Sequence, residues 1–462
     1  MQHVVRFHRP IIGDGSIRFS WESSALDTLF RDQLNYVELE YHNSVELNLE
    51  TSYHQLMCLF FPLLHGGIGG DVHVIFEDPL DAEAVAHWIQ LRGSTSVTVG
   101  SKTFQGKSPT HVSGPANGVA LLYGGGKDSL GALSVFSNAW PDRELSLLRV
   151  HWSKQSVERH RSIFNTEVIA RLRKSFDFNY LECSSTFHRN LVDRKSAHHV
   201  GLSFYHACML PYYRTYHFEA VNYSYDALEF HTTPSQGYVS LRPEAARQTS
   251  MILDALGMET KIRNISFGIP SFLHFDIVKL TDAKNLAMMY MCEDTRSRWC
   301  YNCRKCFTFA LLGLEAGMKE EDLEFAYSSL LGPSGYITTN ILPLLEKSHG
   351  EYSPKLAYKA QFSSFQHVLS HLDPSELKSL GIVDEEFINV ITKLRALYAS
   401  IHPLTRQIWS KAVRFEGQED ADTLLRFFEN LGLPSCGLQS VKMRTNRETT
   451  FQIPEEYHKE PL

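Results

Sequence analysis

Residues 119–131 read VALLYGGGKDSLG and join an apolar run, three adjacent glycines and the start of a helical pattern. The apolar run predicts a buried β-strand, and the residues from Lys127 onward predict a helix. Glycine permits a positive φ and a close approach of ligand to backbone, while the first N–H groups of a helix carry partial positive charge. A tight turn alone would need only one or two glycines, so the stretch predicts an anion-binding strand–loop–helix junction.

Strands and helices alternate in the sequence that begins at this junction. From Gly118 the alternation predicts a parallel sheet covered by helices on both faces, and hence an α/β fold. Residues 1–112 predict a smaller α+β domain, and residues 103–117, rich in Gly, Ser and Pro, predict a linker. We therefore expect three parts: an N-terminal α+β domain (1–112), an α/β domain that carries the junction (113–316) and a helical C-terminal region (317–462).

Composition limits the classes of partner. A net charge of −7 over 462 residues argues against broad nucleic-acid binding, which needs a basic face for phosphates. No window reaches the ~18 apolar residues that a membrane-spanning helix needs, and the longest apolar run, 56–64, contains Pro62. The first residues lack the apolar core of a secretory signal. We expect a cytoplasmic protein without a membrane partner.

Four of the eight cysteines lie close together, as Cys292, Cys300, Cys303 and Cys306. Closely spaced thiolates in a reducing compartment favour metal binding over disulfides. Four thiolates suit tetrahedral Zn²⁺ and leave no open coordination position, so a zinc ion here would be structural. An iron–sulfur cluster and four free thiols are the alternatives.

Two common phosphate-binding motifs do not fit the glycine junction. Asp128 stands between Lys127 and Ser129, which breaks the Walker A pattern, and the dinucleotide fingerprint Gly-x-Gly-x-x-Gly is also absent. The residues Gly124-Gly-Gly-Lys-Asp-Ser129 instead resemble the Ser-Gly-Gly-x-Asp-Ser loop of the PP-loop ATP pyrophosphatases, with Gly124 at the usual serine position. The resemblance implies that the loop holds the pyrophosphate end of ATP while an acceptor oxygen attacks the α-phosphate.

The resemblance also implies a role for each loop residue. Gly125 and Gly126 would offer backbone N–H groups and Ser129 a hydroxyl. A carboxylate beside phosphates is repulsive unless a cation lies between them, so Asp128 implies Mg²⁺. Lys127 would add positive charge or face solvent.

Together the loop and the cysteine spacing resemble the 7-cyano-7-deazaguanine synthases (QueC-type enzymes) over residues 118–316. The family's substrate loop would place substrate contacts at Asn222 and Asp226. The position of a phosphate-binding lysine is occupied by His274, for which Lys279 or Lys284 would have to compensate. The additional N- and C-terminal regions resemble QueC-like proteins of antiphage gene clusters of the Qat and CBASS types.

The expected function is therefore an ATP-dependent C–N ligase. A carboxylate, probably on a 7-deazaguanine, would be activated as its adenylate, releasing pyrophosphate, and then attacked by ammonia or by an amine of a partner protein. Two alternatives remain: a PP-loop enzyme of RNA thiolation, and a nucleotide-binding, non-catalytic subunit of a defence complex. His151 and the pair His198-His199 are expected to be ordinary buried or surface histidines, because adenylation needs no histidine.

Overall fold

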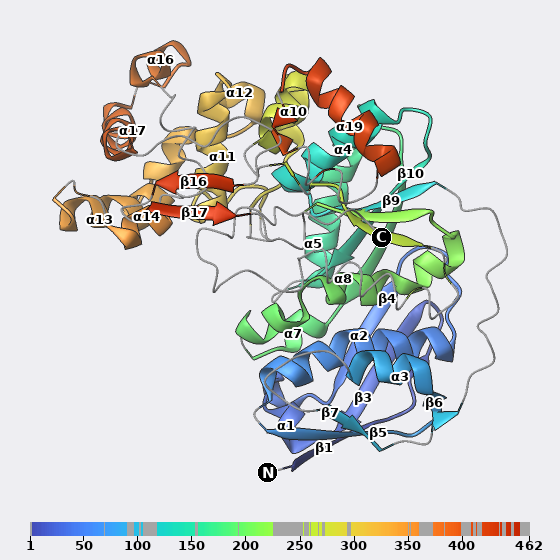
Figure 1. The fold of residues 1–462 in the computed structure, drawn as a ribbon. Coiled ribbons are helices and arrows are strands. Elements are labelled where there is room, and N and C mark those ends of the chain that lie inside the picture. The colour runs from blue at the N-terminus through green and yellow to red at the C-terminus, as the bar shows by residue number, and fades with distance from the viewer. Residues whose placement is uncertain are drawn as a thin grey trace.

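The structure is a computed structural model (Figure 1). It describes residues 2–68, 70–89, 97–100, 103–104, 118–152, 156–192, 194–224, 253, 258, 260–266, 268–269, 273–292, 297–349, 351, 353–359, 373–382, 384–398, 408–409, 413, 418–433, 435–436, 440–444 and 448–452.

The described strands are β1 (Gln2–Phe7), β2 (Ile11–Ile12), β3 (Ser16–Glu22), β4 (Tyr36–Tyr41), β5 (Asp71–Phe76), β6 (Leu80–Asp81), β7 (Val97–Val99), β8 (Thr103–Phe104), β9 (Val119–Leu122), β10 (Leu145–His151), β11 (Asn179–Ser185), β12 (Ala220–Tyr223), β13 (Lys261–Asn264), β14 (Ile408–Trp409), β15 (Ser435–Cys436), β16 (Ser440–Arg444) and β17 (Glu448–Gln452).

The described α-helices are α1 (Ser24–Asp27), α2 (Leu49–Gly67), α3 (Ala82–Ile89), α4 (Lys127–Ala139), α5 (Val157–Phe164), α6 (Ala170–Leu172), α7 (Phe187–Asn190), α8 (Arg194–Tyr216), α10 (Leu273–Asp282), α11 (Arg304–Glu315), α12 (Glu320–Leu323), α13 (Leu342–Lys347), α14 (Pro354–Lys359), α16 (Pro374–Ser379), α17 (Glu385–Tyr398) and α19 (Gln418–Asn430). Short 3₁₀ segments are η1 (Arg31–Gln33), η5 (Ala283–Met288) and η6 (Tyr327–Leu331), and π-helical turns are η2 (Asn165–Ile169) and η7 (Ile337–Ile341).

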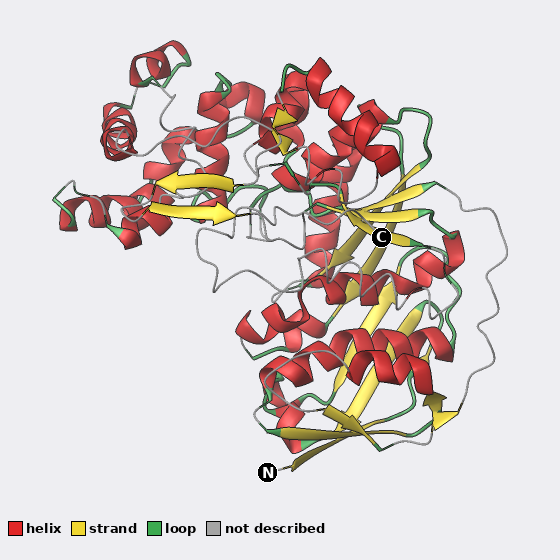
Figure 2. Ribbon diagram, viewed as in Figure 1, coloured by secondary structure: helices red, strands yellow, loops and turns green. Residues whose placement is uncertain are grey.

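One large, mostly parallel sheet runs through the molecule, in the order β13-β12-β9-β10-β11-β4-β3-β1-β5-β7 (Figure 2). The five strands from β13 to β11 are all parallel. Numbered along the chain, their order is 3-2-1-4-5, the doubly wound arrangement in which the strand order reverses between the first and the fourth strand. This confirms an α/β fold with a parallel core.

The N-terminal strands extend the same sheet. β11 pairs antiparallel with β4, with Cys183 opposite Tyr41, so the sheet is continuous across the boundary predicted after residue 112. The strands and helices expected in residues 1–99 are present as β1, β3, β4, β5, β7, α2 and α3. Most of the predicted linker lies outside the described residues, and the division into three domains stays a prediction.

Alternate residues of the parallel strands enter two separate cores. Leu121 and Leu147 belong to the core under α4 and α10, while Ala120, Leu148 and Val150 belong to the core under α2 and α8. A strand that is buried on both faces reads as a continuous apolar run, which is why 119–122 carries no polar residue. Helices cover both faces of the parallel strands, as the alternation predicted.

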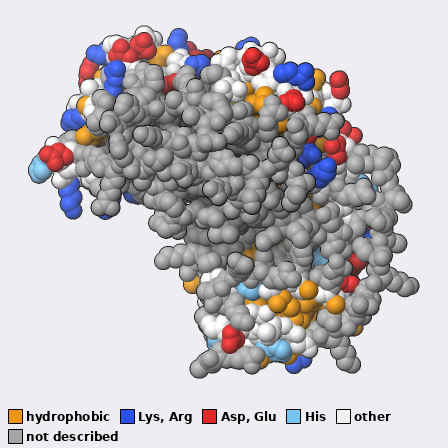
Figure 3. All heavy atoms as spheres, in the orientation of Figure 1, with side chains coloured by type: hydrophobic (Ala, Val, Ile, Leu, Met, Phe, Trp, Pro, Cys, Tyr) orange, Lys and Arg blue, Asp and Glu red, His pale blue; other side chains and the backbone are white. Residues whose placement is uncertain are grey.

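The C-terminal region is mainly helical in its described parts, from α11 to α19. It also contains the two-stranded pairs β14–β15 and β16–β17, strands that the expectation of a helical region did not include. Among the described residues that are coloured in Figure 3, acidic and basic side chains lie intermixed rather than in a field of one sign. None of the described helices is long and apolar enough to cross a membrane.

Candidate functional site

The glycine loop, residues 124–126, lies at the carboxyl end of β9 and leads directly into α4. β9 is flanked by β10 on one side and β12 on the other, so the loop occupies the point where the strand order reverses. In open α/β sheets, ligands bind in the crevice outside the carboxyl ends of the strands at this point. The fold therefore puts the predicted anion-binding loop where such sheets bind ligands.

Each glycine of the loop meets a different environment. Gly125 has φ of +82°, and a Cβ on it would lie 2.8 Å from Cε2 of Phe164. A Cβ on Gly126 would have no atom within 4 Å, and a Cβ on exposed Gly124 would touch nothing closer than 3.8 Å. Gly125 is thus required by the backbone and the packing, whereas Gly124 and Gly126 leave open space beside the loop.

The helix that follows presents its N-terminus to this space. Gly126 is the N-cap residue of α4 and has no side chain that could cap the first N–H groups. Lys127 is buried and its Nζ lies 2.6 Å from Oδ1 of Asp128, whose side chain is one-third exposed. Ser129 donates a hydrogen bond from Oγ to the carbonyl of Gly126 at 3.1 Å. The sequence-predicted loop residues therefore lie together around one helix N-terminus.

His274 lies behind the loop, in the interface between α4 and α10. It is fully buried, and within the described structure neither of its ring nitrogens has a hydrogen-bond partner. A Cβ on Gly131 would lie 2.6 Å from its Nδ1, so this glycine is needed for the close approach of the two helices. Burial lowers the pKa of His274 to about 4, although the nearby Asp128 carboxylate acts in the opposite direction.

The two lysines expected to compensate for His274 lie on the same segment. Lys279 is half-buried on α10, and Lys284 is exposed in η5. His274 is neutral at pH 7, so it contributes no positive charge there. A phosphate contact by either lysine stays a prediction.

The four clustered cysteines converge as the spacing predicted. Their Sγ atoms all lie within 4.8 Å of one another, with Cys300 and Cys303 at 3.9 and 3.5 Å from Cys306. A tetrahedral zinc ion with Zn–S bonds of about 2.3 Å separates its sulfur atoms by about 3.8 Å. The donor set therefore fits a metal ion such as zinc.

Backbone amides surround the sulfur atoms. The N–H groups of Cys300, Asn302 and Cys306 donate to sulfur at 3.3–3.4 Å. Tyr301 adopts a positive φ of 56°, which turns the chain between two of the cysteines. Such N–H···S contacts stabilise thiolates and orient them toward a common centre.

The cysteine cluster is coupled to the glycine loop through the segment that precedes it. The N–H of Tyr290 donates to the carbonyl of Gly125 at 2.7 Å, two residues before Cys292. The side chain of Tyr290 also packs edge-on against Phe164, whose ring faces Gly125. A metal bound by the cysteines would therefore fix the position of Tyr290, which contacts the glycine loop on one side.

Sequence reasoning missed two charged residues on the strands beside the loop. Arg149 lies among the mainly apolar residues of strand β10, and its Nη1 donates to the carbonyl of Tyr123 at 3.2 Å. Glu182, opposite it on β11, is 4% exposed and binds His151 at 3.0 Å and Arg161 at 2.7 Å. A charge among the mainly apolar residues of β10 was a signal that could have identified Arg149, whereas β11 (NYLECSS) offers no such contrast for Glu182.

Glu182 is the centre of a buried polar network. Burial alone would raise its pKa, but hydrogen bonds from His151, Arg161 and Asn165 outweigh burial and lower the pKa to about 2. Burial lowers the pKa of His151 to about 4. His151 is buried, as expected for a histidine outside the chemistry, and its place in the network makes it a structural partner of Glu182. The backbone of His198-His199 lies in α8.

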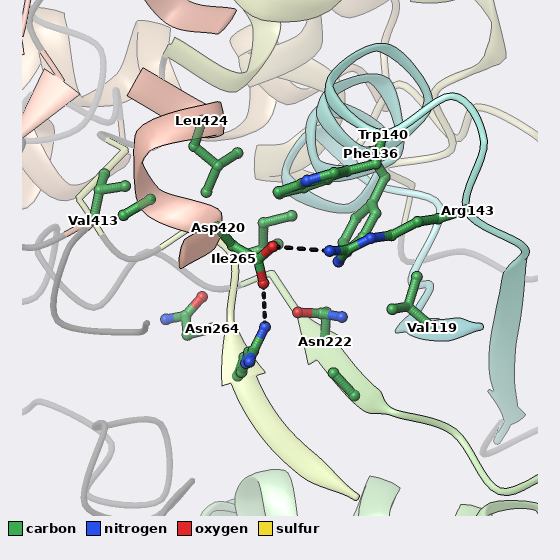
Figure 4. A pocket seen from close by; sticks show the side chains of 13 residues that line it. Val119, Phe136, Trp140, Arg143, Asn222, Asn264, Ile265, Val413, Asp420 and Leu424 are labelled. Carbon is green, nitrogen blue, oxygen red and sulfur yellow. Dashed lines mark hydrogen bonds and ion pairs between the residues drawn. The ribbon is translucent and has the colours of Figure 1, made fainter. Parts of the chain in front are cut away.

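Asn222, predicted to contact substrate, is buried on β12 and donates to the carbonyl of Ala120 at 3.2 Å. It lines a pocket of about 30 Å³ beneath α19, in which Asp420 pairs with both Arg143 and Arg263 (Figure 4). This volume holds about one or two water molecules. Asp226 lies outside the described residues, so a substrate role for either residue stays a prediction.

The described arrangement combines the glycine loop, the N-terminus of α4, the partly exposed carboxylate of Asp128 and the two cations Lys127 and Arg149. Such a group can bind a polyanion and a divalent metal together. Comparison of the chain with family models, curated proteins and solved structures gave no match.

Proposed function

We propose that the glycine loop binds the phosphates of ATP, and that the protein cleaves ATP between the α- and β-phosphates. The observation that carries this proposal is the position of the loop. An uncapped helix N-terminus follows three glycines at the strand-order reversal, and a Cβ on Gly126 would meet open space. A phosphate can approach the backbone closely there and accept its N–H groups.

The loop sequence favours α-phosphate chemistry. The Asp128 carboxylate is one-third exposed beside the loop and pairs with Lys127. Asp128 would hold Mg²⁺, which neutralises charge on the phosphate oxygens. Lys127 and the N–H groups of α4 would bind the pyrophosphate end. An acceptor carboxylate oxygen would form a bond to the α-phosphorus as the bond to pyrophosphate breaks.

The resemblance to QueC-type enzymes suggests how the reaction continues. The acceptor would be a carboxylate, probably of a 7-deazaguanine, and ammonia or an amine of a partner protein would attack the acyl adenylate. A C–N bond forms, and AMP leaves. The regions outside 118–316 resemble the additional regions of QueC-like proteins in antiphage gene clusters, and by that resemblance the protein would act in antiphage defence with a partner from the same cluster.

The four cysteines would hold a structural zinc ion, because four thiolates leave no open coordination position. Their convergence on one cluster also disfavours the RNA-thiolation alternative, which would need a separate persulfide-carrying cysteine. Three of the remaining cysteines, Cys58, Cys183 and Cys208, are buried. The described side chains coloured in Figure 3 do not form a basic field of the kind that RNA binding needs.

The test is pyrophosphate release from Mg-ATP with 7-carboxy-7-deazaguanine and ammonium as probes. Asp128→Ala should abolish release while leaving the protein folded, and Asp142→Ala should release at the wild-type rate. Asp142 is a suitable control because it is exposed beyond the opposite end of α4. Release by Asp128→Ala at the wild-type rate would show that the loop assignment is wrong. Binding of ATP without any turnover would favour the non-catalytic alternative.

A further inference from the structure

Arg149 projects from β10 into the space between the sheet and α5. Its guanidinium carbon lies 4.2 Å from the centre of the Phe164 ring, Nη1 donates to the Tyr123 carbonyl, and Nη2 lies 3.5 Å from Nε2 of His160. Its buried Nε has no hydrogen-bond partner in the described structure. A guanidinium carries five N–H donors, so most of its donor capacity is unused.

No carboxylate neutralises Arg149 in the part of the chain that the structure describes. Glu182, its cross-strand neighbour, is bound to His151, Arg161 and Asn165 instead. The other groups around the guanidinium are neutral at pH 7. They are His160, whose pKa burial lowers to about 3, and the hydroxyls of Tyr123, Tyr180, Tyr205 and Tyr290.

A cation in this position is costly unless an anion joins it. Desolvation of a charged group without a counter-ion is unfavourable, and an arginine retains its proton under such conditions. Ionisable groups whose charge is disfavoured by their surroundings cluster at functional sites, where a ligand can supply the opposite charge. The ring of Phe164 covers one face of the guanidinium and does not replace that counter-charge.

The open space beside the guanidinium is that of the glycine loop. A Cβ on Gly124 would lie 3.8 Å from Nη1 of Arg149 and 3.8 Å from Oγ of Ser129. Gly124 therefore sits between the guanidinium and the hydroxyl at the start of α4, and it is exposed. An oxyanion placed over Gly124 would lie within reach of Nη1, and of the Ser129 hydroxyl once that hydroxyl releases the Gly126 carbonyl.

We propose that Arg149 binds an oxyanion of the ligand held at the glycine loop, on the β10 side of Gly124. This inference rests on the proposed function, which supplies two sources for the oxyanion: a phosphate of the nucleotide and the carboxylate of the acceptor. In either case the planar guanidinium fork provides charge-assisted hydrogen bonds that a neutral residue cannot.

The experiment measures ligand affinity by calorimetry for the wild type, Arg149→Met and the control Arg143→Met. Arg143 is a partly exposed arginine paired with Asp420 at the far end of α4. The probes are AMP, adenosine, inorganic pyrophosphate and 7-carboxy-7-deazaguanine. If Arg149 binds phosphate, Arg149→Met should lower affinity for AMP about 10- to 100-fold and leave that for adenosine unchanged. If it binds the acceptor, only the affinity for 7-carboxy-7-deazaguanine should fall.

A folded Arg149→Met protein that binds all four probes as tightly as the wild type would overturn the inference. If Arg149→Met does not fold, Arg149→Gln retains an N–H donor toward the Tyr123 carbonyl and should show the same losses. If the wild type binds none of the nucleotides, the proposed function fails and the inference is tested with inorganic phosphate. Loss of phosphate binding in the Arg149 variant alone would support it, and a wild type that binds no phosphate would overturn it.

Discussion

Replacing Gly125 and Gly126 separately by alanine should distinguish a glycine needed for folding from one needed for ligand access. Gly125 has φ of +82°, and its Cβ would lie 2.8 Å from Cε2 of Phe164 and 3.4 Å from Cβ of Tyr290. Gly126 has φ of −78° and ψ of 179°, which any residue adopts, and its Cβ would have no neighbour within 4 Å. The two substitutions add the same methyl group one residue apart.

The structure sets the expected sizes of the two effects. An L-residue in the left-handed region costs roughly 1–2 kcal/mol, and overpacking against the Phe164 ring costs roughly 1–3 kcal/mol more. Gly125→Ala should therefore lose about 2–5 kcal/mol of unfolding free energy. Gly126→Ala replaces an N-cap glycine with a poorer N-cap residue and should lose less than about 1 kcal/mol.

Urea denaturation followed by tryptophan fluorescence and titration with Mg-ATP would measure both effects. Gly125→Ala should unfold at clearly lower urea. Gly126→Ala should unfold like the wild type but bind ATP about tenfold more weakly, a loss of about 1.4 kcal/mol, because its methyl group occupies the space through which a phosphate approaches. Wild-type stability of Gly125→Ala would refute the loop geometry, and full ATP affinity of Gly126→Ala would refute phosphate approach at that residue.

Three further predictions concern substitutions at residues outside the loop. Removal of a metal bound at the cysteines, or Cys306→Ser, should weaken ATP binding roughly 2- to 10-fold. That loss corresponds to the contribution of the hydrogen bond from the Tyr290 N–H to the Gly125 carbonyl. An unchanged ATP affinity in calorimetry would contradict coupling between the cysteine cluster and the loop. Glu182 has a pKa of about 2 against an ordinary 4.5, so it contributes at most about 3 kcal/mol above pH 4.5 that is lost as the pH falls toward 2. Urea titrations between pH 2.5 and 6 should show a flatter stability curve for Glu182→Gln, and identical curves would rule this out. Asp420→Asn should cost about 1–3 kcal/mol by leaving two arginines without their carboxylate, whereas Glu429→Gln, exposed on the same helix, should unfold like the wild type.

The features that the sequence predicted correctly are local in the chain. The strand–loop–helix junction needs only residues 119–139, and the four cysteines span fifteen positions, so patterns of neighbours suffice to identify both. The alternation of strands and helices predicted a parallel sheet for the same reason. A cluster of cysteines in one short loop also has little freedom to separate its sulfur atoms.

The pairing of distant strands was not predictable in this way. β4 pairs with β11 across about 140 residues, which makes one sheet of strands expected in two domains. The contact between Tyr290 and Gly125, and the position of Arg149 beside Gly124, depend on the folded arrangement of three separate elements. Patterns of residues that are neighbours in the chain cannot predict contacts between elements so far apart in the sequence. Arg149 was still visible as a lone charge in the mainly apolar strand 145–151.

The most direct test of the central claim is the identity of the products formed from ATP. Wild-type protein would be incubated with Mg-ATP, 7-carboxy-7-deazaguanine and ammonium, and the phosphorus-containing products identified by ³¹P NMR, with Asp128→Ala as the control. The proposed α-phosphate chemistry predicts AMP and pyrophosphate in equal amounts from the wild type and neither from the variant. Formation of ADP and inorganic phosphate would contradict it.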